Sequence, residues 1–201
     1  MDASRAVVQN AARVVDCRAT QIWLWGQGVK PALPSFAHTY GVHGRMSSAV
    51  DLVVGLGVLT GIEVVDVPGA TAGFDNDYRG QADACVRSLA DRDLFVLHVE
   101  ATDEAGHQGR ADIKVDALER WDRDIIAPVV DALDTAGEAY RILLMPDHAT
   151  PCDIKTHSAD PVPYLLFDSE HTGPGGRYSE PATATSPPVP GHGLMTRLVA
   201  R

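Results

Sequence analysis

Short apolar segments alternate with helix-like segments along this chain, and this alternation restricts the fold more than any other feature. The apolar segments cover residues 62–67, 94–99, 140–145 and 162–167. Patterns with a helical period lie between them at residues 76–89 and 112–135, and a closing helix is predicted at 192–200. Strands separated by helices form β-α-β units. The sequence therefore predicts an α/β fold with a mostly parallel, open sheet and helices on both faces.

The remaining elements follow from local signals. Residues 3–16 have apolar positions at helical spacing, and residues 21–25 have the aromatic composition of a short strand. A helix that starts at Ser47 or Ser48 is expected to end near Leu59. Pro128 interrupts the 112–135 pattern and predicts a kink or two consecutive helices. We expect one domain over residues 1–201, with a surface loop at 170–190.

Composition excludes several classes of protein. The chain has 201 residues, of which 45% are hydrophobic, enough for one globular core. A net charge of −10 argues against a nucleic-acid partner. No apolar run approaches the roughly 18 residues of a membrane span. The three cysteines are scattered without C-x-x-C spacing, which favours reduced thiols in a cytoplasmic protein.

Three polar clusters follow predicted strands or their exit loops, and their side chains are those of metal ligands. Asp103 and His107 have a spacing of four, about one helical turn, so both can face one ion. Asp147 and His148 are adjacent and lie just beyond residues 140–145, and His157 lies in a turn-rich run. Ligands of open α/β sheets bind beyond the carboxyl ends of the strands. The sequence therefore predicts a metal site at this edge of the sheet.

Several motifs make a family resemblance specific. They are IWLWGQG (22–28), SAVDL (48–52), VPGAT (67–71), HVEATDEAGH (98–107), PDH (146–148) and KTHSADPVP (155–163). Together they resemble the archaeal-type cofactor-independent phosphoglycerate mutases of the alkaline phosphatase superfamily. The resemblance runs from about residue 19 to the end of the chain. It implies an alkaline-phosphatase-like core that binds two divalent transition metal ions.

The resemblance assigns roles at matching positions only. Asp103, His107 and His157 match ligands of the first metal, and Asp147 and His148 match ligands of the second. An aspartate and the nucleophilic serine, which complete the second site, belong to a first portion of the family that this sequence does not contain. The same holds for the inserted domain that grips the substrate. The second site is therefore expected to be incomplete. His43 replaces a lysine of the family and is a possible phosphate contact.

These roles lead to three hypotheses for function. The first is an isomerase of glycolysis that interconverts 3-phosphoglycerate and 2-phosphoglycerate through a phosphoserine supplied by another segment, so the chain alone should be inactive. The second is a non-catalytic metal-binding remnant, or one half of a split enzyme. The third is a related phosphotransferase that acts on homoserine or another small phosphate acceptor. Asp plus two His suits manganese, zinc, cobalt or iron alike.

An incomplete core also predicts a partner. A sheet without its first strand exposes a hydrogen-bonding edge and an apolar face. We therefore expect self-association or binding of a complementary N-terminal polypeptide, besides a phosphoglycerate-type substrate.

Overall fold

The chain divides into two compact units. The computed structural model describes residues 1–12, 18–24 and 26–200. The units are Met1–Ala32 and Leu33–Arg201. The first contains helix α1 (Ser4–Ala11), where the Ser4 hydroxyl accepts a hydrogen bond of 3.1 Å from the backbone N–H of Ile22. Residues 21–24 form no strand, while residue 25 and residues 13–16 of the predicted opening helix lie outside the described residues.

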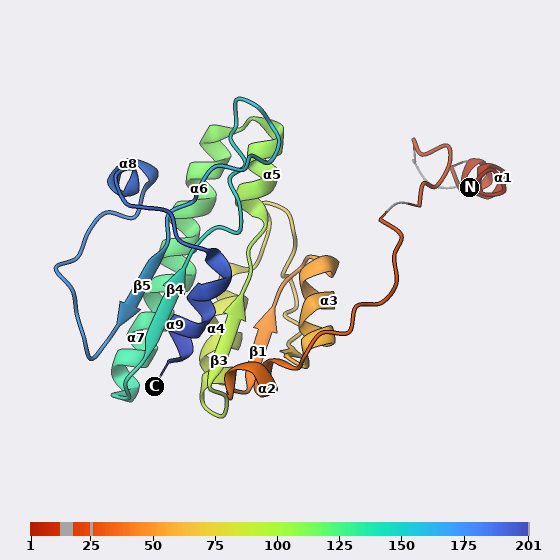
Figure 1. The fold of residues 1–201 in the computed structure, drawn as a ribbon. Coiled ribbons are helices and arrows are strands. Elements are labelled where there is room, and N and C mark those ends of the chain that lie inside the picture. Colours follow the sequence, from red (N-terminus) through yellow and green to blue (C-terminus); the bar gives the residue numbers. More distant parts are fainter. Residues whose placement is uncertain (13–17, 25, 201) are drawn as a thin grey trace. The chain divides into compact units, whose positions relative to one another are not determined.

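A parallel sheet organises the larger unit (Figure 1). It consists of β1 (Gly44–Ser47), β2 (Glu63–Val64) and β3 (Leu94–Leu97), in the order β2-β1-β3. Both neighbours of β1 are parallel to it, and Ser47 pairs with Leu97 at the carboxyl end of the ladder. Helix α3 (Asp51–Thr60) packs on β1 and β2, and α4 (Tyr78–Leu89) packs on β1 and β3. The predicted α/β class with a parallel sheet is confirmed.

The last two strands form an antiparallel pair. Strand β4 (Arg141–Leu144) pairs with β5 (Leu165–Asp168), and Leu144 lies opposite Leu165. A parallel pair needs a crossover connection, usually a helix. Residues 145–164 form turns and loops instead, so the chain simply reverses direction. This pair is the antiparallel part of the mostly parallel arrangement that the sequence predicted.

A bulge explains how the long helical segment accommodates proline. Helix α6 (Ala111–Trp121) continues through a π-helical turn (Asp122–Ile126) into α7 (Ala127–Ala136). Pro128 has no N–H to donate to a carbonyl of the preceding turn, and it sits in the first turn of α7, directly after the π-helical turn. The N–H of Ala127 reaches back five residues to the carbonyl of Asp122. The helix therefore passes the proline by widening one turn.

The other helices are short and connect these layers. Helix α2 (Phe36–Tyr40) precedes β1, and α5 (Ala101–Gln108) follows β3. Helix α8 (Glu180–Thr183) interrupts the predicted surface loop at 170–190, most of whose residues are exposed. A 3₁₀ turn (Gly191–Gly193) leads into α9 (Leu194–Val199), where the closing helix was predicted. Within the described part of the chain, no helix is both long and apolar enough to cross a membrane.

The core lies between α4 and the π-helical turn. Tyr78, Ala82 and Ile125 are buried there, with Leu97 and Trp121 packed against them. The Arg120 guanidinium lies 4.5 Å from the centre of the Tyr78 ring and donates to the Phe74 carbonyl at 2.8 Å, so it ties the loop before α4 to α6. Cys85 and Cys152 are free thiols. Burial raises the pKa of the Cys85 thiol to about 12, so this thiol stays protonated at neutral pH.

Candidate metal centre

Helix α5 carries two of the predicted metal ligands. Glu100 ends the connection from β3, and α5 places Asp103 and His107 one turn apart on the same face. A carboxylate oxygen (Oδ2) of Asp103 lies 3.2 Å from Nε2 of His107. The helix ends at Gly109 in the left-handed conformation, with φ of 68°. The i,i+4 spacing read from the sequence therefore brings the two side chains together.

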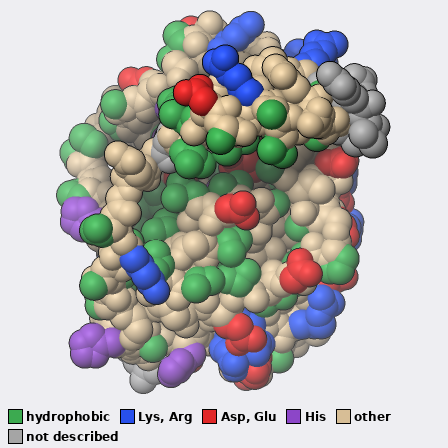
Figure 2. Space-filling model, turned by 90° about the vertical axis from the view of Figure 1, so that its right-hand side faces the viewer, with side chains coloured by type: hydrophobic (Ala, Val, Ile, Leu, Met, Phe, Trp, Pro, Cys, Tyr) green, Lys and Arg blue, Asp and Glu red, His purple; other side chains and the backbone are tan. Residues whose placement is uncertain are grey.

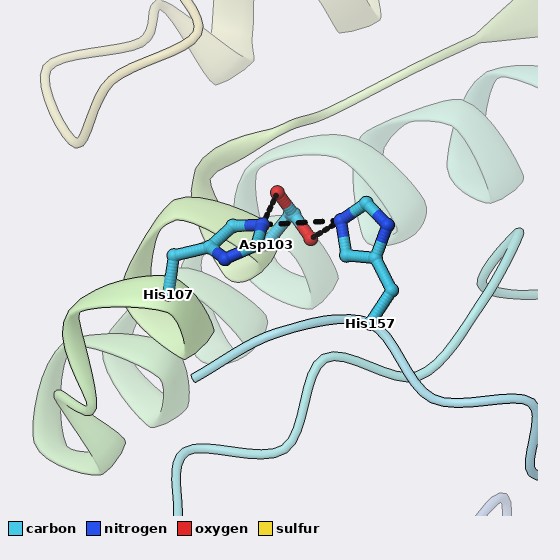
Figure 3. A group of neighbouring side chains, drawn as sticks. All are labelled: Asp103, His107 and His157. Atoms are coloured by element: carbon cyan, nitrogen blue, oxygen red, sulfur yellow. Dashed lines mark hydrogen bonds and ion pairs between the residues drawn. The ribbon is translucent and has the colours of Figure 1, made fainter. Parts of the chain in front are cut away.

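His157 joins them from a loop fifty residues away (Figure 3). Its Nε2 lies 3.1 Å from Nε2 of His107 and 3.4 Å from Oδ1 of Asp103. The three side chains point toward one another, and one donor atom from each lies within 4.8 Å of the other two. Asp103 is the least exposed side chain of the three at 18%, and His157 is the most exposed at 52%. The cluster therefore opens to solvent on the His157 side.

A backbone carbonyl orients His107. Nδ1 of His107 lies 3.0 Å from the carbonyl oxygen of Lys155, which can only accept, so Nδ1 carries the proton. Nε2 is then left with a free lone pair directed at Asp103 and His157. Lys155 adopts φ of 55°, which is uncommon for a residue with a side chain. Its loop lies so close to α5 that a Cβ on Gly109 would approach Lys155 Cε to 2.6 Å.

Asp147 and His148 follow β4 and reach the edge of this cluster. Nε2 of His148 lies 3.5 Å from Oδ2 of Asp147. The ring of His148 stacks on that of His157, with centroids 3.8 Å apart and planes tilted by 32°. Asp147 is 70% exposed. The pair lies beside the Asp103, His107 and His157 cluster without belonging to the three-residue group itself.

Carboxylates form a second group around Asp103. Oxygens of Glu100, Asp103 and Glu104 also lie within 4.8 Å of one another. Burial raises the pKa of Glu100. The neighbouring His98 opposes this increase in the pKa, and the negative charges of Asp103 and Asp147 add to it. His98 is half-buried, and its Nδ1 lies 3.0 Å from the hydroxyl of Ser48 at the carboxyl end of β1. The Ser48 hydroxyl, which also accepts from the backbone N–H of Val50, therefore links the ends of β1 and β3.

His43 lies elsewhere. It precedes β1, at the amino end of the sheet, where its backbone N–H donates to Oδ2 of Asp93 at 2.8 Å. Gly44, the next residue, pairs with Leu94 at the start of β3, whereas the cluster follows the carboxyl end of β3. The structure therefore does not bring His43 together with the other predicted site residues.

Sequence reasoning missed two residues that shape the centre. The Thr150 hydroxyl lies 2.5 Å from Oδ1 of Asp103 and 3.3 Å from Nδ1 of His148. The sequence gives no clear signal for this hydroxyl, because residues 147–148 form a bend rather than a regular strand. The contribution of Lys155 is a carbonyl, and no side-chain pattern in the sequence reports where a carbonyl points.

The donor atoms match the requirements of a transition metal. Ligands at 2.0–2.1 Å in a tetrahedral arrangement lie about 3.3 Å apart. The two imidazole Nε2 atoms are 3.1 Å apart, and each lies 3.2–3.4 Å from a different oxygen of the Asp103 carboxylate. Two imidazoles and one carboxylate, with an open solvent side, form a ligand set typical of a catalytic rather than a closed structural site. One donor atom from each side chain lies within 4.8 Å of the other two, a spacing that is compatible with a shared divalent ion.

The family follows from a match over most of the chain. A profile of the metalloenzyme superfamily matches residues 9–186. The chain belongs to the metalloenzyme superfamily. The chain is 48% identical to a 2,3-bisphosphoglycerate-independent phosphoglycerate mutase of Methanothrix thermoacetophila over 151 residues. The aligned region covers 75% of this chain and 38% of that protein. The resemblance read from the motifs is confirmed.

Solved structures agree with the fold. A protein of Pyrococcus horikoshii aligns with a TM-score of 0.62 at 33% identity, covering 67% of this chain and 40% of that one. A cofactor-independent phosphoglycerate mutase of Thermoplasma acidophilum aligns with a TM-score of 0.59 over 84% of this chain and 39% of that one. At 22% identity, this second likeness concerns the fold alone. The chain spans about 40% of the length of the relatives that it matches.

Proposed function

We propose that the chain provides the metal-binding core of a cytoplasmic phosphoglycerate mutase. Asp103, His107 and His157 hold the first divalent transition ion. The observation that carries this assignment is their convergence: one donor atom from each lies within 4.8 Å of the other two, and the two Nε2 atoms are 3.1 Å apart. Asp147 and His148 contribute to a second ion beside it. The free Nε2 lone pair of His107 supports the assignment, because a metal-bound imidazole must offer an unprotonated nitrogen.

The reaction that we propose is the interconversion of 3-phosphoglycerate and 2-phosphoglycerate. Ions bound here would polarise the phosphate oxygens and neutralise developing charge. Asp103, which contacts both histidines, would fix the spacing of the ligands while phosphate oxygens approach from the open His157 side. By resemblance, the phosphate-carrying serine comes from the part of the relatives that these residues do not match. The chain by itself should therefore bind metal without turning over substrate.

Metal content after dialysis tests the assignment. The unchanged chain should retain about one transition ion tightly. His107→Ala should lose most of it, because a carboxylate and one imidazole remain. His171→Ala is the matched control: this histidine is 79% exposed beside Asp168 at the end of β5, and its removal should leave the metal content unchanged. An unchanged protein without metal, or a His107→Ala variant that keeps it, would refute the site.

A mutase assay of the metal-loaded chain separates the alternatives. We expect turnover only after a polypeptide with the remaining length of the family is added. Metal binding without turnover in that mixture would identify a non-catalytic remnant. Turnover with homoserine as acceptor would keep the site and change the substrate. Turnover by the chain alone would place the nucleophile within these 201 residues.

Helix α3 provides the surface on which we expect the complementary polypeptide to bind. Leu52, Leu56 and Val58 are 74%, 48% and 66% exposed, and Gly57 is the only buried residue of this apolar helix. Hydrophobic side chains gather on the face of the molecule seen in Figure 2, which looks from the side where α3 lies in Figure 1. Large exposed apolar patches mark interaction surfaces. The neighbouring strand β2 forms an edge of the three-stranded sheet.

Sedimentation velocity tests this surface. The isolated chain should self-associate through α3, and the complementary polypeptide should replace that association with a defined complex. Leu52→Glu should prevent both, because it places a charge in an apolar contact. Val115→Glu, at a 54% exposed position on α6, is the control and should leave both unchanged. A chain that stays monomeric and binds no complementary polypeptide would contradict the proposal.

A further inference from the structure

Thr150 occupies the junction between the two pairs of proposed ligands. It follows β4 in the loop that carries His148, and it is only 3% exposed. Its hydroxyl contacts Oδ1 of Asp103 at 2.5 Å and Nδ1 of His148 at 3.3 Å. Asp103 belongs to the first proposed metal position and His148 to the second. One buried hydroxyl therefore touches a ligand of each.

The direction of the two hydrogen bonds follows from chemistry. An ionised carboxylate only accepts, so the single hydroxyl proton of Thr150 is donated to Asp103. The oxygen of Thr150 can then only accept from His148, which places the ring proton on Nδ1. Nε2 of His148 is left with a free lone pair. The carbonyl of Lys155 imposes the same tautomer on His107. Both histidines thus offer the same ring nitrogen to an ion.

The backbone around Thr150 is fixed from three sides. Nζ of Lys114, on α6, donates to the Thr150 carbonyl at 2.7 Å. Ala149 pairs with Ser158 in an antiparallel bridge, which connects this segment to the one that carries His157. Gly106 of α5 packs against the Thr150 carbonyl so closely that a Cβ there would lie 2.4 Å from the oxygen. Because the backbone is fixed, the Thr150 hydroxyl has a defined position from which it can orient Asp103 and His148.

We propose that Thr150 is a positioning residue that couples the two metal positions by orienting Asp103 and fixing the tautomer of His148. This inference rests on the proposed metal site. Side chains that orient metal ligands typically change metal affinity by 10–100-fold when removed. Loss of this hydroxyl should affect the ligand geometry on both sides, because Asp103 and His148 both lose a hydrogen-bond partner. The contacts with Asp103 and His148 are made by the hydroxyl, so the hydroxyl carries the proposed effect.

Three variants separate the hydroxyl from the rest of the side chain. Thr150→Val keeps the shape and removes the hydroxyl, Thr150→Ala removes it without any risk of a clash, and Thr150→Ser restores it. Zinc affinity is measured by competition with a chromophoric chelator. The Val and Ala variants should bind zinc about 10–100-fold more weakly. The Ser variant should bind close to the level of the unchanged protein. Thermal unfolding of each metal-free variant shows whether the variant is folded. If the Val variant is unfolded, the zinc affinity of the Ala variant tests the role of the hydroxyl.

A second readout needs no metal. Long-range ¹H–¹⁵N spectra of the metal-free protein should show His148 protonated at Nδ1, and this preference should disappear in Thr150→Ala and remain in Thr150→Ser. Unchanged zinc affinity in the hydroxyl-free variants, or an unchanged His148 tautomer, would overturn the inference. An unchanged protein that binds no zinc would refute the metal site, while the tautomer measurement would still decide the role of Thr150.

Discussion

Replacing Gly106 by alanine is expected to lower the free energy of unfolding by about 2 kcal/mol and to weaken metal binding. The added Cβ would lie 2.4 Å from the carbonyl oxygen and 2.8 Å from Cγ2 of Thr150, where neither atom can easily move. Overpacking of this kind typically costs about 1–3 kcal/mol. Because the contact here is with a backbone atom that cannot move away, we expect a cost of about 3 kcal/mol. The higher helix propensity of alanine returns about 1 kcal/mol. The steric cost is larger than the gain in helix propensity, so the substitution should destabilise the protein.

Gly55→Ala is the matched control for this substitution. Gly55 also lies inside a helix, α3, but its Cβ would meet no atom within 4 Å. There only the propensity term remains, so this variant should be more stable by about 1 kcal/mol. Chemical denaturation of both metal-free variants and a zinc titration provide the measurements. Equal stabilisation of the two variants would show that α5 does not pack tightly on the loop of Thr150.

The close approach at Gly106 shows where sequence reasoning succeeded and where it stopped. The alternation of apolar and helical segments predicted the α/β class, because strand and helix patterns can both be recognised within short stretches of sequence. The spacing of Asp103 and His107 is equally local, and α5 presents both as expected. Contacts between α5 and the loop at 150–157 depend on segments about fifty residues apart, and no periodicity in the sequence reports them.

Other departures have the same origin. Residues 140–145 and 162–167 were correctly identified as strands, with ends that differ by one to three residues, but their antiparallel pairing depends on a connection that lacks a crossover helix. Pro128 predicted a kink or a break, and the π-helical turn is a third solution that keeps the helix continuous. His157 entered the sequence analysis through its turn-rich surroundings and the resemblance. Its position 3.1 Å from His107 required the folded loop.

Replacing Gln81 by methionine should lower the free energy of unfolding by about 2–3 kcal/mol. Gln81 lies on α4 and is 1% exposed. Its Oε1 accepts from Nδ2 of Asn76 at 2.8 Å, and its Nε2 donates to the carbonyl of His98 at 3.2 Å. Methionine preserves most of the volume but leaves both partners unpaired. Each buried polar group without a partner costs about 1–3 kcal/mol, and the added apolar burial offsets only part of that.

The effect should extend to the metal centre, because the His98 carbonyl lies on the segment between β3 and α5. Without Gln81, the exit of β3 loses its link to α4, and the start of the helix that carries Asp103 becomes less fixed. Gln108→Met makes the same substitution at an exposed position and should change stability by less than about 0.5 kcal/mol. Denaturation and zinc titration of the two variants form the comparison. If both variants were equally stable, the buried amide would contribute nothing to the fold; if only stability fell, the link from α4 to the metal ligands would be wrong.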